Sequence, residues 1–346
     1  MESAINPPKQ KGHRSKRLWL LPGLFVGIGV LAVSLVFSVM LGAADITPAV
    51  VIESLINFDE TSFDHLVIQT VRLPRVIAGA FVGASLAVAG AIMQGLTRNP
   101  LASPGILGIT VGASFAVVLA VFILGSPPLT IYAFFAMIGA ASAAAIVYGI
   151  GSMGPGRGVS PLRLVLAGVI LSAFLGSFTT ALLIMDQDTL DQIRFWTVGS
   201  LAGREWELIR VTAPYMIVGM VGALLMGRQI TTISLGEDIA AGLGQNTARV
   251  KLLAAIATVL AAGGAVALAG PIGFVGLIAP HIVRFFVGTD YRWIIPYSAL
   301  VGALLVIGGD MVARVIIRPQ ELPVGIVMGM LGAPFFLYLA RWKVKN

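Results

Sequence analysis

The sequence of 346 residues contains no cysteine and only three histidines, and these scarcities exclude several kinds of site. Without cysteine there is no disulfide, no thiolate metal site and no cysteine nucleophile. The histidines, at positions 13, 65 and 281, do not form a metal-binding motif such as His-Glu-x-x-His. No Gly-Lys pair occurs, so the phosphate-binding loop Gly-x-x-x-x-Gly-Lys-Ser/Thr is missing as well. If ATP drives this protein, we expect another subunit to bind it.

Charged residues are also scarce, at 11% of the chain against about 25% in ordinary soluble domains, whereas hydrophobic residues make up 57%. A helix needs about 20 apolar residues to cross a bilayer, and ten windows of that kind can be placed. We therefore predict an all-α integral membrane protein of ten crossings. The windows are Leu18 to Leu41, Leu73 to Gly95, Gly105 to Leu124, Ile131 to Gly149, Leu162 to Met185, Leu208 to Met226, Leu252 to Ala269, Ile272 to Val287, Ile294 to Ala313 and Val324 to Leu339.

The distribution of charge predicts the orientation of these helices. Residues 1–17 form a basic tail, which the positive-inside rule places in the cytoplasm, and residues 18–346 form one transmembrane domain. With ten crossings both termini are cytoplasmic, sixteen of the 23 Lys and Arg residues lie inside, and eleven of the sixteen acidic residues lie outside. No small-residue cleavage site follows the first apolar run promptly, so we interpret it as a retained helix in the cell membrane. The net charge of +7 then faces anionic lipid, and nucleic acid is not an expected partner.

Two arginines break this charge rule at the predicted outer start of the second helix. The run Arg72-Leu73-Pro74-Arg75 places a proline in a first helical turn, where its missing N–H costs nothing. Two cations at a helix N-terminus oppose the macrodipole. We therefore expect an acidic external partner to use them, or else the side chains to extend to lipid phosphates. Arg314, also outside, ends its helix at the favourable terminus and follows Asp310 by four residues, the spacing of an ion pair.

A short helix is expected on the cytoplasmic side between the sixth and seventh crossings, in residues 235–244. Ser234 with Glu237 has the spacing of a capping box, and Gly244 is placed to end the helix. We expect Ile239, Ala240 and Leu243 to be exposed, so that this segment fits a groove in another subunit. An ordinary interfacial helix remains the alternative.

The cytoplasmic turn from Gln94 to Gly105 is the third segment of interest, because its two prolines impose a fixed non-helical path. Asn99 and Leu101 place a polar and an apolar side chain at the mouth of the bundle. They form either a gate or a turn without a gating role.

Two other classes of function remain to be weighed. An ion-driven secondary carrier needs ionisable residues at membrane depth, and Asp310 is the one candidate. An intramembrane enzyme needs polar residues that converge at mid-depth, and the windows contain too few.

The same segments resemble the FecCD-type permeases, which are membrane subunits of type II ABC importers for iron-siderophores, haem and vitamin B12. The resemblance extends from about Arg72 to Leu339. It is carried by Arg72-Leu73-Pro74-Arg75, Gly90 through Gln94 to Asn99-Pro100-Leu101-Ala102, Pro104-Gly105, Leu235-Gly236-Glu237, Leu243-Gly244, Gly273-Phe274-Val275-Gly276-Leu277, Pro280-His281, Arg284, Glu321-Leu322-Pro323-Val324-Gly325 and Gly332-Ala333-Pro334.

The resemblance implies a transport subunit without enzymatic activity or cofactor, which dimerises with a second copy or a sister permease. ATP-binding subunits would bind its cytoplasmic side and a substrate-binding protein its outer side. Iron-siderophore is the expected cargo, with haem or vitamin B12 as alternatives. The implied binding-protein contacts are Arg72, Arg75 and Arg314; the implied ATPase coupling residues are Leu235, Gly236, Glu237, Ile239, Leu243 and Gly244; and the implied gate residues are Asn99, Leu101 and Ser160.

Overall fold

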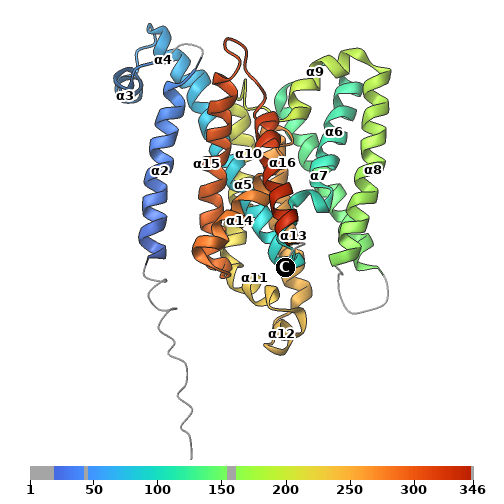
Figure 1. Ribbon diagram of the computed structural model, residues 1–346. Helices are drawn as coiled ribbons and strands as arrows, with labels where there is room; N and C mark the ends of the chain where they lie inside the picture. Colours follow the sequence, from blue (N-terminus) through green and yellow to red (C-terminus); the bar gives the residue numbers. More distant parts are fainter. Residues whose placement is uncertain (1–18, 43–45, 154–160, 344–346) are drawn as a thin grey trace, which may run out of the picture.

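The computed structural model describes residues 19–42, 46–153 and 161–343, and all regular secondary structure in the described part is helical (Figure 1). Each of the ten predicted windows corresponds to one helix. They are α2 (Leu20–Met40), α5 (Leu73–Thr97), α6 (Ile109–Leu124), α7 (Leu129–Ser152), α8 (Pro161–Met185), α10 (Trp206–Leu225), α13 (Thr247–Ala269), α14 (Val275–Val287), α15 (Tyr291–Val315) and α16 (Val324–Lys343).

Seven of these helices are long and apolar enough to span a bilayer, and α6, α14 and α16 are shorter apolar helices. This confirms the predicted all-α membrane fold. The predicted division between the windows Leu252 to Ala269 and Ile272 to Val287 is also confirmed, because α13 ends at Ala269 and α14 begins at Val275.

Short helices at the two ends of the bundle connect the long ones. At one end lie α3 (Pro48–Ile56), α4 (Phe63–Val67) and α9 (Gln187–Val198), and a short π-helix, Ile68–Arg72, joins α4 to α5 (Figure 1). At the other end lie α11 (Gly227–Ser234), α12 (Glu237–Gly242) and the end of α16. We call these the α9 end and the α12 end.

Helix α5 occupies the centre of the bundle, and most of its residues are buried. Glycine permits the closest approaches to it. A Cβ atom on Gly83 would collide with the backbone of Gly302 in α15, and one on Gly90 would collide with the backbone of Gly276 in α14. Backbones can meet this closely only where the side chain is absent, so these glycines set the spacing of α5 from its neighbours.

Other glycines also permit close contacts between helices. Gly112 of α6 faces Gly139 of α7, and Gly325 of α16 faces the backbone of Val198. Gly329, four positions after Gly325, has open space around it and makes no such contact among the described residues.

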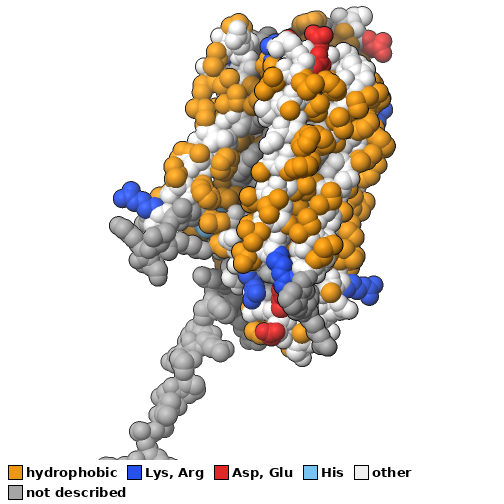
Figure 2. Space-filling view, turned by 90° about the vertical axis from the view of Figure 1, so that its right-hand side faces the viewer, with side chains coloured by type: hydrophobic (Ala, Val, Ile, Leu, Met, Phe, Trp, Pro, Cys, Tyr) orange, Lys and Arg blue, Asp and Glu red, His pale blue; other side chains and the backbone are white. Residues whose placement is uncertain are grey.

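The outer surface of the bundle matches a lipid environment. On the face shown in Figure 2, hydrophobic side chains cover the middle and charged side chains lie towards the two ends. Helix α8 contributes to this apolar surface, with Phe174 and Phe178 both at least half exposed. An apolar exterior of this kind is stable in hydrocarbon and unfavourable in water.

Candidate functional site

Helix α12 presents an apolar face away from the rest of the chain. Leu235, Ile239 and Leu243 are 64%, 53% and 71% exposed, whereas Ala240 is fully buried beside Ile233. The prediction that Ala240 is exposed was therefore wrong, because the helix turns that residue towards α11. The remaining three side chains form an exposed apolar patch at the α12 end, which we call the α12 patch.

The start and end of α12 differ in how well the sequence predicted them. Ser234 does not cap α12; it is the last residue of α11, and its hydroxyl donates to the Thr231 carbonyl. The N-cap is Gly236, whose φ of 137° is a backbone conformation that other residues rarely adopt. Gly244, with φ of 80°, ends the helix as predicted, and its N–H donates to the Ala241 carbonyl.

An ion pair joins α12 to the membrane part of the chain. The Glu237 carboxylate lies 2.6 Å from Lys251 Nζ at the start of α13, and the side chains are 28% and 8% exposed. Glu237 also lies in the first turn of α12, where a negative charge is favoured by the helix dipole. The pair thus connects α12 directly to α13.

The turn after α5 holds Asn99 and Leu101 in a fixed arrangement. Arg98 ends α5 in the left-handed conformation, with φ of 51°. The Asn99 side-chain oxygen then accepts a hydrogen bond from the Leu101 N–H at 3.0 Å, which closes an Asx turn. Asn99 is exposed and Leu101 is half-buried. Ser160, the third predicted gate residue, lies outside the described residues.

The turn after α5 also lies next to α12. A Cβ atom on Gly236 would be 3.9 Å from Arg98 Nη1, so the guanidinium group passes close to the start of α12. Three features of the predicted inner surface are therefore neighbours: the turn, α12 and the start of α13.

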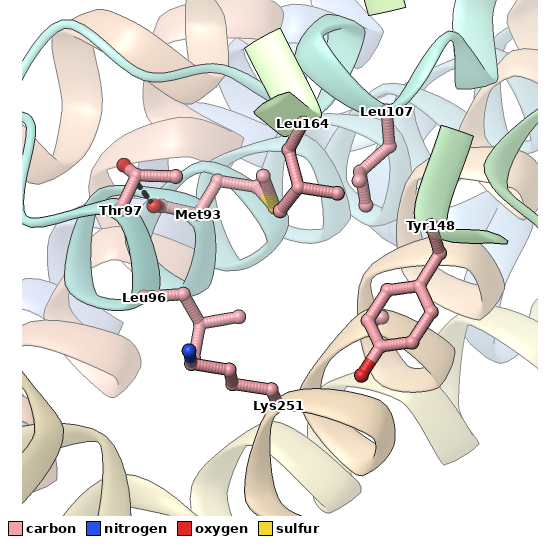
Figure 3. A pocket seen from close by; sticks show the side chains of 8 residues that line it. Met93, Leu96, Thr97, Leu107, Tyr148, Leu164 and Lys251 are labelled. Carbon is pink, nitrogen blue, oxygen red and sulfur yellow. Dashed lines mark hydrogen bonds between the residues drawn. The ribbon is translucent and has the colours of Figure 1, made fainter. Parts of the chain in front are cut away.

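A small cavity opens just above this junction (Figure 3). Its volume is about 20 Å³, and it is enclosed by α5, α7, α8 and α13. Lys251 and Leu96 lie on one side, with Tyr148 across from them. A cavity of this size holds about one water molecule, so it is not a passage for a larger solute.

At the α9 end, Arg75 forms a buried network with two carboxylates. Its Nη2 atom lies 2.9 Å from an Asp310 carboxylate oxygen, and its Nη1 atom lies 2.5 Å from Glu321. Asp310 also pairs with Arg314 at 3.0 Å, the contact that their spacing of four residues predicts. Helices α5 and α15 and the segment before α16 are thereby joined.

Arg72 and Arg314 have a further set of partners at the end of α2. Arg72 Nη1 donates to the Val39 and Met40 carbonyls, at 2.8 and 2.9 Å. Arg314 Nη1 donates to the Ser38 carbonyl at 2.9 Å and to the Leu41 carbonyl. The last carbonyls of a helix have no partner within it and favour positive charge. Arg72 and Arg314 therefore provide the partners of the carbonyls at the C-terminus of α2.

These contacts change how the three arginines are understood. Arg72, Arg75 and Arg314 are 7%, 8% and 3% exposed, so they neither extend to lipid phosphates nor stand on the outer surface. Direct contact with an external protein would require the contacts described above to open, and it stays a prediction. Asp310, the candidate of the ion-driven carrier, is 1% exposed and paired with two arginines.

Several residues of the sequence motifs have packing roles that the sequence did not reveal. The Gln94 amide donates to the Gly276 and Leu277 carbonyls, which fixes the first turn of α14 against α5. The Arg284 guanidinium donates to the Tyr291 hydroxyl at 2.7 Å, and His281 packs edge-on against Phe335 of α16. Among the residues that the structure describes, no cluster of three His, Cys, Asp or Glu side chains could hold a metal ion.

Comparison with known proteins agrees with this architecture. The model of the FecCD transport family matches residues 30–342. The permease protein FhuB of an iron(3+)-hydroxamate import system from Bacillus subtilis is 44% identical over 92% of this chain and 82% of its own length. FepD, the permease protein of a ferric enterobactin transport system from Escherichia coli, is 39% identical over 94% of this chain and 96% of its own.

A solved structure has the same fold over nearly the whole chain. It is an inward-facing ABC transporter described as metal-chelate type, with a TM-score of 0.80 and 29% identity over 93% of this chain and 99% of that one. Family, relatives and fold agree, and they confirm the resemblance found in the sequence motifs. The chain belongs to the FecCD transport family and is a multi-pass ABC transporter permease, a transport subunit rather than an enzyme.

Proposed function

We propose that this permease carries ferric siderophore complexes into the cytoplasm as part of an ABC importer. The observation that carries the choice of cargo is the similarity to permeases of iron-chelate import systems along nearly the entire chain. Haem is the second candidate, because a hemin transport permease from Yersinia pestis is 39% identical over 78% of this chain.

We assign the orientation in the membrane from the two ends of the chain and from the basic tail. We assign the α12 end to the cytoplasm, since the first described residues of α2 and the end of α16 lie there (Figure 1). The basic tail that precedes α2 would then face anionic lipid. The α9 end faces outwards, with both termini inside.

ATP-binding subunits would bind beneath the α12 patch. Exposed leucine and isoleucine side chains on a helix outside the membrane are unfavourable in water, and a groove on a partner would bury them. The ion pair between Glu237 and Lys251 then links that groove to α13. Leu235, Ile239 and Leu243 provide the contact, and Gly236 and Gly244 set the ends of the helix.

A second permease copy, or a sister permease, would complete the translocation path. The cavity above α12 holds about one water, which is too small for a metal chelate. The exposed side of α8 offers an apolar surface for the partner copy. Asn99, Leu101 and Ser160 would line the cytoplasmic gate of the shared path.

A substrate-binding protein would dock on the α9 end. Arg72, Arg75 and Arg314 fix the relative positions of α2, α5 and α15 there, and they would support the docking surface. ATP-driven movement of the partner subunits can act only through contacts that differ between conformations. The α12 patch, the turn after α5 and α13 are the elements suited to that role.

Uptake measurements test this proposal. Cells that lack the chain would be given radiolabelled ferric siderophores, haem and cobalamin, with and without depletion of ATP. We expect loss of ATP-dependent uptake of one ferric siderophore and its recovery on reintroduction of the gene. Loss of haem or cobalamin uptake alone would show that this compound, and not a ferric siderophore, is the cargo. Uptake that survives ATP depletion would contradict the proposal of an ATP-driven importer.

A further inference from the structure

A pocket at the α9 end, with the side chain of Arg204 in its wall, is unused by the roles described so far. Its volume is about 440 Å³, within the range of small-molecule sites. It lies between α9, the segment 199–205 that follows it, and the segment that precedes α16. Its walls are formed by Phe195, Trp196, Ser200, Ala202, Gly203, Arg204, Glu321, Leu322 and Pro323.

Arg204 is buried in this pocket without a counter-charge. The residue is 6% exposed, and its Nε atom donates to the Ser200 carbonyl at 3.2 Å. Among the described residues no carboxylate forms an ion pair with it. A guanidinium group carries five N–H donors, and among the described residues only the Nε donor of Arg204 has a hydrogen bond. Burial lowers the pKa of Arg204 to about 10, which leaves the group charged at neutral pH.

The carboxylate in the pocket wall does not neutralise this cation. Glu321 is already paired with Arg75, with 2.5 Å between Oε2 and Nη1. The pocket therefore has an excess positive charge. A buried and unpaired cation is unfavourable, and a perturbed titratable group in a pocket marks a candidate functional site.

The backbone around Arg204 is fixed before any ligand arrives. The Ser200 N–H donates to the Ala269 carbonyl at 2.8 Å, and the Gly325 N–H donates to the Gly199 carbonyl at 2.9 Å. Gly199 has φ of 85°, and a Cβ atom there would collide with the Pro271 carbonyl. A cation on a fixed backbone loses little freedom on binding, which favours affinity.

We propose that this pocket is an anion site for a carboxylate group of a small ligand at the outer mouth of the permease. Arg204 would bind the carboxylate through paired N–H donors, a geometry that guanidinium and carboxylate share. Phe195 and Trp196 would cover the carbon frame of the ligand. The assignment of this end as the outer one rests on the proposed function; the chemistry of the site does not.

Binding of citrate to the full-length chain in lipid nanodiscs tests the site. Trp196 lies in the wall, so tryptophan fluorescence or calorimetry can follow titration with citrate at constant ionic strength. We expect saturable binding that Arg204→Gln weakens at least tenfold. Arg210→Gln is the matched control, because Arg210 is exposed six residues further on and should leave the affinity unchanged. Chloride at equal ionic strength should not saturate the signal.

Two further variants separate a ligand site from a structural role. Ala202→Trp fills the pocket and leaves Arg204 in place, and it should abolish citrate binding. Arg204→Met removes an unpaired buried charge and should keep or raise the unfolding temperature, whereas an arginine that holds the fold together would lower it. A wild-type response to citrate in Ala202→Trp or Arg204→Gln would overturn the site.

The same nanodisc preparation shows whether the carboxylate comes from a small ligand or from an acidic protein. Citrate binding without any partner protein supports a small-ligand site. No citrate binding, together with Arg204-dependent capture of an acidic binding protein, would overturn it in favour of protein docking. Citrate binding in a chain that fails every uptake assay would leave this site standing and remove the importer proposal alone.

Discussion

The Glu237 carboxylate and the Lys251 ammonium group lie 2.6 Å apart and join α12 to α13. Lys251 is the more buried partner, and its stem lines the small cavity between α5, α7, α8 and α13 (Figure 3). The pair thus connects an exposed helix to the place where four membrane helices converge. This is the contact through which the proposed coupling to the ATP-binding subunits would act.

Replacing Glu237 by Gln should uncouple ATP hydrolysis from uptake. The variant keeps the shape of the side chain and removes the charge that attracts Lys251. We expect uptake per ATP hydrolysed to fall at least about fivefold in the reconstituted transporter, the lower end of common coupling energies. Asp238→Asn is the control, because it makes the same change at an exposed neighbour. A charge exchange, Glu237→Lys with Lys251→Glu, should restore part of the loss; equal ratios in all variants would exclude this link.

Replacing Leu243 by Asp should release the ATP-binding subunits from the permease. A charge within the α12 patch must be desolvated when a partner covers it, which costs several kcal/mol. The change leaves the fold intact because Leu243 is 71% exposed. Co-purification and ATPase activity in the assembled complex measure the effect.

Ala248→Asp is the matched control for the α12 patch, since Ala248 is exposed in the first turn of α13 and outside the patch. It should retain the ATP-binding subunits. If both aspartates release them, the surface charge matters and the patch does not; if neither does, α12 is an ordinary interfacial helix.

Replacing Arg314 by Met should destabilise the permease even without any partner. The change leaves Asp310 with one of its two cations and removes donors from the carbonyls at the end of α2. Breaking one side of a buried pair costs about 3 to 5 kcal/mol. We expect a clear drop in the unfolding temperature of the isolated chain in nanodiscs. Arg194→Gln is the control: it breaks the pair with Asp191, in which both side chains are more than half exposed, and it should change the unfolding temperature little. If Arg314→Met leaves the stability unchanged but weakens capture of the binding protein, Arg314 contacts that protein and does not stabilise the fold.

The sequence predicted the helices well because their signals are local. Apolar length and the bias of positive charge can be read without knowing which helix lies beside which. The i to i+4 pair of Asp310 and Arg314 was equally visible. The position of Gly244 at the end of α12 follows from the backbone preference of a single residue.

The partners of the arginines could not be predicted in the same way. Arg75 and Asp310 are 235 positions apart, and only the packing of α5 on α15 brings them together. The sequence correctly marked the cations as unusual, but the acceptors proved to be in the same chain. Ser234 shows a different limit of prediction from sequence. Its spacing to Glu237 is that of a capping box, but α11 extends as far as Ser234, so this residue does not cap α12.

Replacing Gly90 by Ala should damage the permease far more than the same change at Gly308. A methyl group on Gly90 would overlap the Gly276 backbone, which belongs to another helix and cannot rotate away. Overpacking of this kind typically costs about 1 to 3 kcal/mol and can exceed it where backbones meet. Gly308 in α15 has open space around it, so an added Cβ atom there should be neutral or slightly stabilising.

Yield, gel-filtration profile and unfolding temperature of the two alanine variants measure this difference. We expect Gly90→Ala to lower the unfolding temperature or prevent recovery of the folded chain, while Gly308→Ala matches the wild type. Equal behaviour would show that α5 and α14 can separate without cost. In that case the spacing of the central helices would not depend on the glycine contact, and the packing of Gln94 against the start of α14 would have to maintain it.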